Sequence, residues 1–316
     1  MSFGFRKSFY RLLKKKQQNL LERGCNPVGN WYNILMPYIL SHASVAYRLG
    51  KRLGCCKTEQ DRALYMLGSL GPDIYFFDRL PPTPFHPNQK KHGNALHGVP
   101  CDALVRAFFA RADESLLPYV YGFLTHIALD STLHPYICSR YNGPDHTRFE
   151  GDIDAIFYAR CKDEVPFGEL FRLPANVDAL DSLVTDVSMD TVHAGVKGAF
   201  RRSIKKMLRL FPVLYDPLGK RFRFVAPLEK ALHKEGAVTG FLLAYPRSYF
   251  PDPMNTQHTP WYAKTFPTVC RTESVDELFA EAEAFGERLL RAAMQGDFET
   301  TAALCEKRTL SDGPLP

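Results

Sequence analysis

Histidine and carboxylate residues recur at a regular spacing between positions 125 and 150 of the chain. His126, Asp130 and His134 are separated by steps of four residues, and His146 and Glu150 repeat that step. Residues four apart lie almost one above the other on an α-helix, so each set forms a stripe on one helical face. Imidazole nitrogens and carboxylate oxygens are the ligands that suit Zn²⁺. The spacing therefore predicts a metal site.

The two stripes can converge if the chain reverses between them. Pro135 and the Asn-Gly-Pro run at 142–144 predict a break, after which a second helix begins at His146. Seven of the ten histidines lie between His42 and His146, so imidazole ligands are concentrated in the N-terminal half. The alternative interpretation is that these are separate polar residues on solvated helix faces, or core histidines that each form one hydrogen bond.

Three shorter segments supply further candidate ligands. His42 begins an apolar run that has helical spacing, and Asp73 follows a Gly-Pro pair at the end of another run, which places it at a chain reversal. His97 directly precedes a break at Gly98. Each segment is weak evidence alone, and its weight comes from its order along the chain.

The ordered set of candidate ligands resembles that of the zinc-dependent phospholipase C family, whose relatives include the P1-type nucleases. The residues that carry the resemblance are His42, Asp73, His97, His126, Asp130, His134, His146 and Glu150. The likeness spans roughly residues 31–300, because the Asp-Pro-Met-Asn run at 252–255 and Trp261 also look like a C-terminal segment of bacterial members. It implies an all-α fold, a single multi-helix domain of the zinc-dependent phospholipase C or P1 nuclease type, that holds two or three zinc ions and hydrolyses phosphate esters.

Asp130 and Asp73 are the expected catalytic residues. Asp130 lies between two histidines of one stripe and is the best candidate for a bridging carboxylate, because its two oxygens can address separate ions. Asp73 is a candidate general base in metal-assisted hydrolysis, in which zinc makes hydroxide available at a pH of about 7. The resemblance implies three ion subsites. Asp73, His97 and His126 form one, and His134, His146 and Glu150 form another. His42 belongs to the third.

The N-terminus departs from the family pattern. Secreted members use the free amine and carbonyl of an N-terminal tryptophan at one zinc, whereas the chain ahead of His42 is uninterrupted from Met1. Cleavage before Trp31 recreates the pattern, but no signal cleavage site precedes it. The zinc near His42 therefore needs another ligand or is absent. Trp31 is otherwise expected to pack at the entry to the first helix.

Helical spacing accounts for most of the chain. A multi-helix domain is expected over residues 31–300, after a basic leader of residues 1–30 and before a C-terminal tail of residues 301–316. Ser274 and Glu277 form a capping-box pattern at the start of the last long helix. Helices are expected at 32–53, 58–70, 101–112, 115–134, 146–162, 191–211, 225–244 and 274–294, and long loops at 78–100, 163–180 and 245–272.

Net positive charge is concentrated at the N-terminus. Residues 1–24 contain seven Lys or Arg and one Glu, a net charge of +6 that equals that of the whole 316-residue chain. Phenylalanine and leucine residues are interleaved with them. This pattern predicts either an amphipathic helix that contacts an anionic membrane surface or nucleic acid, or a solvated tail. The balanced charge of the remaining chain makes nucleic acid the less favoured partner.

The cysteines and the hydropathy indicate the compartment. Eight cysteines show no CxxC pair, and the chain has neither an apolar run of about 18 residues nor a secretory signal. We therefore expect a cytoplasmic protein with reduced thiols, in peripheral contact with a membrane at most. No obligate protein partner is expected.

The leading hypothesis is a zinc-dependent phosphodiester hydrolase of phospholipase C type that acts on a phospholipid or a related phosphate ester. The first alternative is a P1-type nuclease or phosphatase with the same metal cluster, because metal ligands recognise the phosphate and not what is attached to it. The second alternative is a non-catalytic binding protein that zinc stabilises. Eight ligands exceed the needs of a closed tetrahedral structural site, which favours catalysis.

Overall fold

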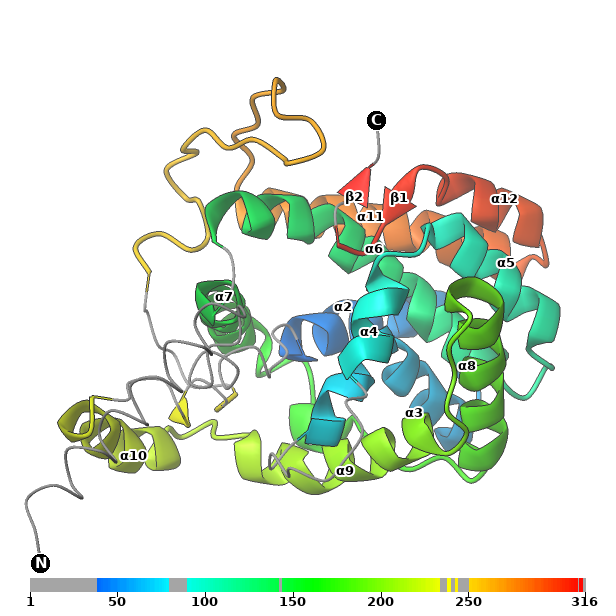
Figure 1. Ribbon diagram of the computed structural model, residues 1–316, viewed down its shortest axis with the longest axis horizontal. Coiled ribbons are helices and arrows are strands. Elements are labelled where there is room, and N and C mark those ends of the chain that lie inside the picture. Colours follow the sequence, from blue (N-terminus) through cyan, green and yellow to red (C-terminus); the bar gives the residue numbers. More distant parts are fainter. Residues whose placement is uncertain are drawn as a thin grey trace, which may run out of the picture.

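The structure is a computed structural model, and it describes residues 39–79, 90–141, 144–233, 238–239, 242–243, 250–311 and 313–314. Helices dominate these residues, which confirms the predicted all-α fold class (Figure 1). The α-helices are α2 (Ile39–Leu53), α3 (Glu59–Gly68), α4 (Lys90–His97), α5 (Cys101–Arg111), α6 (Leu117–Arg140), α7 (Pro144–Cys161), α8 (Val177–Val192), α9 (Ala199–Leu214), α10 (Lys220–Ala231), α11 (Val275–Met294) and α12 (Phe298–Leu304). Two 3₁₀ helices, η1 (Gly71–Arg79) and η2 (Phe167–Glu169), and a short hairpin of β1 (Arg308–Thr309) and β2 (Gly313–Pro314) complete the described elements.

Helix α6 is the central element of the fold. Its residues from Pro118 to Ile137 are nearly all buried, because the helix is apolar on every side apart from the polar stripe. Helices α3 and α11 pack along it, and α2 and α7 also contact it. The polar stripe of α6 therefore lies inside the molecule and not on a solvated face.

Helix α11 follows the sequence prediction closely. Ser274 is its N-cap and forms the capping box with Glu277, as predicted. Its apolar stripe, represented by Leu278, Phe285 and Leu289, is buried in the core. Local capping and spacing are sufficient to define this helix.

The predicted break at Pro135 is wrong, because α6 continues through it to Arg140. A proline has no N–H to donate, so the carbonyl oxygen of Ser131 loses its partner in the helix. Gly313 of β2 packs at that point, where a Cβ atom on Gly313 would lie 2.5 Å from the Ser131 oxygen and 2.6 Å from Pro135 Cγ. The C-terminal hairpin thus covers the defect in the helix.

Several other predicted boundaries are wrong. Helix α8 begins inside the expected loop 163–180 and continues to Val192, and residues 193–198, where a helix is expected, separate α8 from α9. His193 and Gly198 adopt left-handed backbone conformations with φ of 52° and 78°, which end one helix and precede the next. Helix α4 lies within the expected loop 78–100, and α10 begins earlier and ends earlier than the expected helix 225–244.

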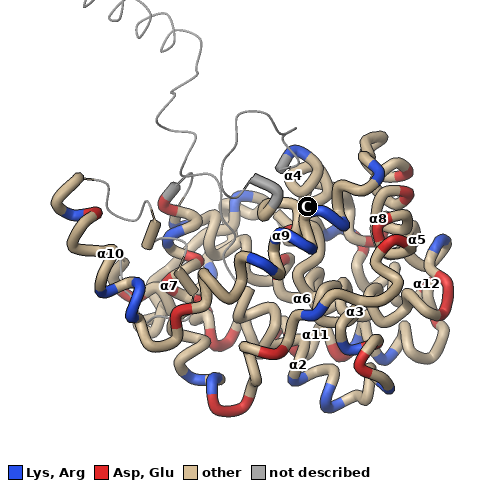
Figure 2. Tube along the Cα trace, turned by 90° about the horizontal axis from the view of Figure 1, so that it is seen from below, with Lys and Arg blue, Asp and Glu red and all other residues tan. Residues whose placement is uncertain are grey.

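The described residues beyond position 300 contact the helical core. Helix α12 packs against α5 and α11, and the hairpin packs against α6. Basic and acidic residues alternate along the trace of the described elements (Figure 2). Within the described part of the chain, no helix is both long and apolar enough to span a bilayer. The predicted basic leader and Trp31 lie outside the described residues.

Candidate metal centre

The structure brings together all eight residues that the sequence singles out. Helix α6 supplies three of them from successive turns, and four other elements converge on that stripe. The contributions are His126, Asp130 and His134 from α6, His42 from α2, Asp73 from η1, His97 from the end of α4, and His146 and Glu150 from α7. They form three groups, two of which share His126, and within each group one ligand atom per residue lies within 4.8 Å of the others.

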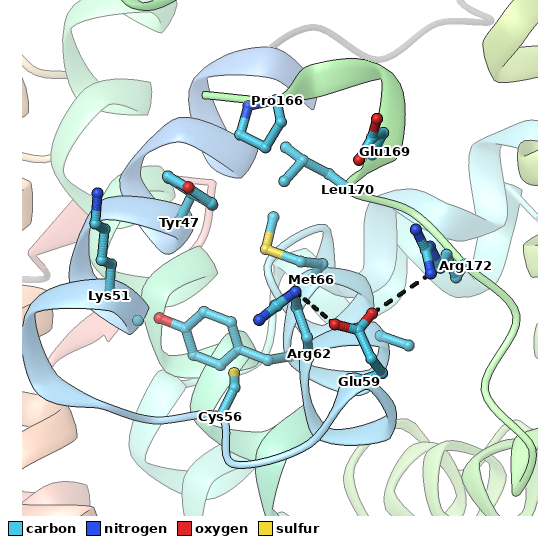
Figure 3. Close-up of a pocket in the computed structure, with 13 residues that line it drawn as sticks. Tyr47, Lys51, Cys56, Glu59, Arg62, Met66, Pro166, Glu169, Leu170 and Arg172 are labelled. Carbon is cyan, nitrogen blue, oxygen red and sulfur yellow. Dashed lines mark hydrogen bonds and ion pairs between the residues drawn. The ribbon is translucent and has the colours of Figure 1, made fainter. Parts of the chain in front are cut away.

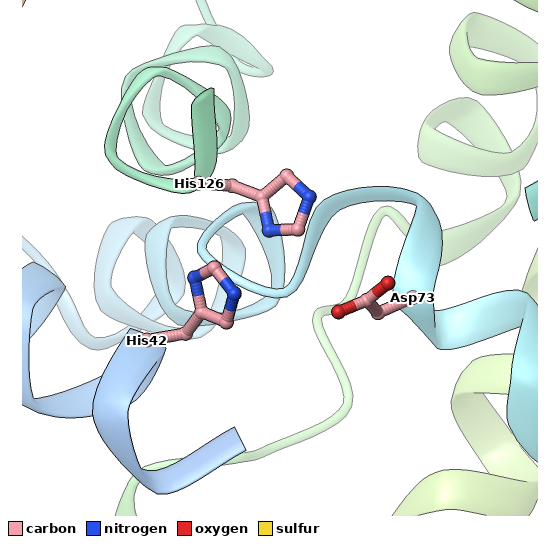
Figure 4. A group of neighbouring side chains, drawn as sticks. All are labelled: His42, Asp73 and His126. Atoms are coloured by element: carbon pink, nitrogen blue, oxygen red, sulfur yellow. The ribbon is translucent and has the colours of Figure 1, made fainter. Parts of the chain in front are cut away.

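The first group consists of His42, Asp73 and His126 (Figure 4). The imidazoles of His42 and His126 are stacked with their centroids 4.5 Å apart, and the Asp73 carboxylate faces the same space. Gly71 makes this approach possible, because a Cβ atom there would lie 2.5 Å from His126 Cδ2. The Gly-Pro-Asp reversal read from the sequence thus brings η1 against the ring of His126.

The second group consists of His97, His126 and Asp130. Asp130 Oδ2 lies 3.2 Å from His126 Nε2 and 3.5 Å from His97 Nε2. Asp130 Oδ1 instead lies 3.0 Å from His42 Nε2. The two oxygens of one buried carboxylate therefore face different histidines.

The third group consists of His134, His146 and Glu150. Glu150 Oε1 lies 3.3 Å from His134 Nε2 and 2.8 Å from His146 Nε2. This group is nearer the surface, since the side chains of His134 and His146 are 13% and 24% exposed, whereas that of His126 is fully buried. The exposed side of the cluster is therefore the side of His146.

The buried atoms fit a bound cation. Both ring nitrogens of His126 and Oδ2 of Asp130 are buried and form no hydrogen bond. Buried polar atoms are normally hydrogen-bonded, and leaving them unsatisfied costs about 1–3 kcal/mol each. Imidazole nitrogen and carboxylate oxygen are common zinc ligands, so a metal ion would satisfy Asp130 Oδ2 and one ring nitrogen of His126. The donor set therefore fits zinc.

Backbone carbonyls orient two of the histidines. His97 Nδ1 donates to the carbonyl oxygen of Gly93 at 2.7 Å, and His134 Nδ1 donates to that of Leu310 at 2.6 Å. Each hydrogen bond places the ring proton on Nδ1 and leaves Nε2 facing the carboxylates. The His134 partner lies in the C-terminal turn between β1 and β2, far from the stripe in sequence.

The carboxylates and burial change the pKa values of the histidines in opposite directions. Burial opposes protonation of His97, but the adjacent carboxylates of Asp130 and Asp73 outweigh it and raise its pKa to about 10. Burial is likewise outweighed at His134 by Asp130 and Glu150, which raise its pKa to about 10. At His126 burial prevails over the attraction of Asp130, and the pKa is lowered.

The pKa values of His146, Asp130 and Glu150 are also set by burial on one side and neighbouring charges on the other. Burial opposes protonation of His146, but Glu150 raises its pKa to about 10. Burial opposes ionisation of Asp130, yet the charges of His126 and His134 hold its pKa well below the usual value. The pKa of Glu150 is also lowered, because His146 and His134 outweigh its burial.

Asp154 positions the beginning of α2. Its Oδ1 accepts from both the backbone N–H and the Oγ of Ser41 at 2.7 Å, and its Oδ2 accepts from the N–H of Leu40 at 3.2 Å. His42 is the next residue, so Asp154 fixes the backbone that carries it. Two other aspartates of α7 have different partners, since Asp145 pairs with Arg148 at the surface and Asp152 accepts from the N–H of Phe250.

Sequence reasoning missed Cys138. Its thiol hydrogen-bonds with His146, and this contact together with the charge of His134 outweighs burial and lowers the thiol pKa. The available signal was spacing, because Cys138 continues the four-residue step of His126, Asp130 and His134 by one more turn. The sulfur therefore borders the third group.

A separate cavity of about 360 Å³ opens between α2, α3 and the segment around η2 (Figure 3). None of the eight residues lines it. Two of its arginines are already paired, since Arg62 and Arg172 lie 2.7 Å and 3.4 Å from carboxylate oxygens of Glu59. The cavity is therefore distinct from the metal centre.

Comparison with known proteins identifies a family. The family model described as zinc dependent phospholipase C matches residues 37–207, more than half of the chain, and this span contains all eight residues. No curated protein and no solved structure matches the chain.

Proposed function

Since the chain belongs to the zinc-dependent phospholipase C family, we propose that it hydrolyses a phosphodiester bond of a phospholipid or a related phosphate ester with the help of two or three zinc ions. The observation that carries the proposal is the position of Asp130. Its Oδ1 lies 3.0 Å from His42 Nε2, and its Oδ2 lies 3.2 Å from His126 Nε2. A carboxylate placed in this way can be shared by two ions.

The ligand assignment takes its subsites from the family resemblance, and the 3.1 Å contact between Asp73 Oδ1 and His97 Nε2 supports one ion shared by these two residues. His97, His126 and Asp73 would hold one ion, His42 would hold a second, and Asp130 would be shared between them. His134, His146 and Glu150 would hold the third. Zinc, when bound, supplies a Lewis acid for the phosphoryl oxygens and lowers the pKa of a water molecule to about 7. Trp31, the expected further contributor near His42, lies outside the described residues.

Asp73 and the exposed histidines have distinct tasks in this proposal. The exposed fraction of the side chain rises from 2% for Asp130 to 10% for Asp73 and 24% for His146, so substrate approaches from the side of Asp73 and His146. A carboxylate at that edge is placed to accept a proton from an attacking water. Asp130 is too deeply buried for this role and acts through the histidines it holds.

Metal counting and a substrate comparison test the proposal. The chain is purified without chelators, its zinc is counted by plasma mass spectrometry, and the same sample is assayed against phosphatidylcholine and single-stranded DNA. We expect two or three zinc ions per chain and turnover of the lipid. Turnover of DNA alone would replace the phospholipase proposal with the nuclease alternative. Zinc with no turnover of either substrate would favour the binding protein that zinc stabilises.

A further inference from the structure

Helix α10 stands apart from the helical body at one end of the molecule (Figures 1 and 2). It also lies beyond residues 37–207, the part of the chain that the family model matches. Two buried carboxylates hold its ends, since Asp216 accepts from the N–H of Phe222 at 2.9 Å and Glu229 accepts from the N–H of Thr239 at 2.9 Å. The helix is thus anchored while one side faces solvent.

The solvent side of α10 is apolar. Phe224, Leu228 and Leu232 follow one another at steps of four, so they lie on one side of the helix, and they are 74%, 53% and 67% exposed. Leu218, in the turn before the helix, is 64% exposed. The neighbouring α9 differs, because its stripe of Phe200, Ile204, Met207 and Phe211 is buried in the core. An exposed apolar stripe of this kind marks an interaction surface.

The same helix is basic. Lys220, Arg221, Arg223 and Lys230 are exposed, whereas the one acidic residue of α10, Glu229, is buried. Arg221 and Arg223 donate to the carbonyl oxygens of Tyr215 and Leu218 at 3.0 Å and 2.7 Å. Among the described residues, no carboxylate forms an ion pair with these cations. The positive charge of α10 therefore remains available to an anionic partner.

We propose that α10 docks on an anionic lipid bilayer, with Phe224, Leu228 and Leu232 entering the headgroup boundary and with Lys220 and Arg221, on the same side of the helix, contacting lipid phosphates. An amphipathic helix with a basic flank and an apolar side binds such a surface through both contributions. Aliphatic side chains in the centre of the stripe favour lipid over nucleic acid, which is bound by stacking aromatic residues in a basic groove. The inference rests on the proposed function, because a phospholipid substrate is presented in a bilayer.

Vesicle sedimentation tests the proposal with the zinc-loaded full chain. Vesicles of phosphatidylcholine with phosphatidylserine are compared with vesicles of phosphatidylcholine alone. We expect the combined Phe224→Ser, Leu228→Ser and Leu232→Ser substitutions to weaken binding to the anionic vesicles at least about tenfold. The pair Lys220→Glu and Arg221→Glu, on the same side of the helix as the apolar stripe, should also weaken it at least about tenfold, and at high salt this variant and the wild type should bind equally weakly.

The matched control removes exposed apolar residues elsewhere on the molecule. Met189, Tyr262 and Val269 are 47%, 48% and 50% exposed, and their replacement by serine should leave vesicle binding unchanged. Zinc content and circular dichroism verify that each variant folds. The proposal would be overturned if the α10 variants bound vesicles as tightly as the wild type does. That result is expected if another segment, such as the leader, binds the vesicles. A change from dimer to monomer in the α10 variants, with vesicle binding intact, would also overturn the proposal. It would show that α10 is a contact between two copies of the chain.

The assay separates this proposal from the proposed function. Vesicle binding requires no turnover. An inactive chain that binds vesicles through α10 would therefore contradict the proposed enzymatic function and support the proposed docking surface. Hydrolysis of a dispersed short-chain phosphatidylcholine should be equal in wild type and α10 variants, because α10 contributes no residue to the metal centre. Turnover of vesicle lipid that is unaffected by the α10 variants would contradict the docking surface alone.

Discussion

The Nδ1 of His134 donates a hydrogen bond to the carbonyl oxygen of Leu310 across 2.6 Å, although 176 positions separate the two residues in sequence. The same turn reaches the end of α4, since the N–H of Ser311 donates to the carbonyl oxygen of His97. Two histidines of the metal centre thus contact a hairpin that lies outside the span matched by the family model. The C-terminal hairpin is a positioning element for the centre, and this can be tested.

Gly313→Ala should weaken zinc binding at the group of His134, His146 and Glu150. A Cβ atom there would lie 2.5 Å from the Ser131 oxygen, so the hairpin must move and His134 loses its carbonyl partner. Loss of such an orienting contact typically costs about 10- to 100-fold in metal affinity. Chelator competition measures the zinc affinity of this group. The other zinc sites should be retained.

Gly296→Ala is the matched control for this substitution. Gly296 also has a positive φ, of 77°, but a Cβ atom there would meet nothing within 4 Å. Its replacement should cost only backbone strain of about 1 kcal/mol and leave zinc affinity unchanged. Equal zinc affinity in both variants would remove the positioning role of the hairpin.

Asp130→Asn should abolish hydrolysis, with a loss of at least about 100-fold, and should reduce bound zinc while most helix content remains. The amide keeps the shape of the side chain but removes the charge that faces His42 and His126 at 3.0 Å and 3.2 Å. Steady-state kinetics and metal counting provide the measurement. Asp145→Asn, at an exposed surface pair, is the control and should behave as wild type. Undiminished activity in Asp130→Asn would exclude the bridging assignment.

The metal-free protein should lose stability as the pH rises from about 6.5 to about 10. His97, His134 and His146 have folded-state pKa values of about 10 against an ordinary value of 6.5, so the protonated forms are favoured by folding. Their contribution is complete below the unfolded pKa and disappears as the pH passes the folded one. Urea unfolding of the metal-free protein at pH 6.5 and 9.5 measures the difference.

Zinc binding should show the complementary pH dependence. Ligating histidines must be neutral, so zinc displaces protons from His97, His134 and His146, and its affinity rises with pH. Calorimetry at pH 7 in two buffers of different ionisation enthalpy should detect proton release. Zinc binding without proton release would show that these histidines are neutral in the metal-free protein.

Asp154→Ala should destabilise the protein by about 1–3 kcal/mol and weaken the zinc subsite at His42. The substitution removes the acceptor of three hydrogen bonds from Leu40 and Ser41 at the beginning of α2. Urea unfolding and zinc counting measure the two effects. Asp297→Ala removes the exposed cap of α12 and should cost about 1 kcal/mol with zinc unchanged. Full zinc content in Asp154→Ala would mean that His42 does not depend on this contact.

The features that could be read from the chain are those set by local spacing. A four-residue step has one geometric meaning on a helix, so the stripes of His126, Asp130 and His134 and of His146 and Glu150 were predictable before any folding. The same holds for α11, whose cap at Ser274 and apolar repeat define the helix locally. These signals predicted helices and five of the eight residues that the structure gathers, whereas His42, Asp73 and His97 were predicted from their order along the chain and the family resemblance that it carries.

Other features depend on contacts between distant segments, and no local pattern encodes them. Pro135 predicts a break, yet α6 continues to Arg140, and Gly313 packs against the freed carbonyl of Ser131. The partner of His134 is a backbone carbonyl at Leu310, which any residue type could supply. The exposure of Phe224 depends on α10 standing away from the core. Such relationships arise from tertiary packing, because only the folded chain decides which distant groups meet and which remain exposed to solvent.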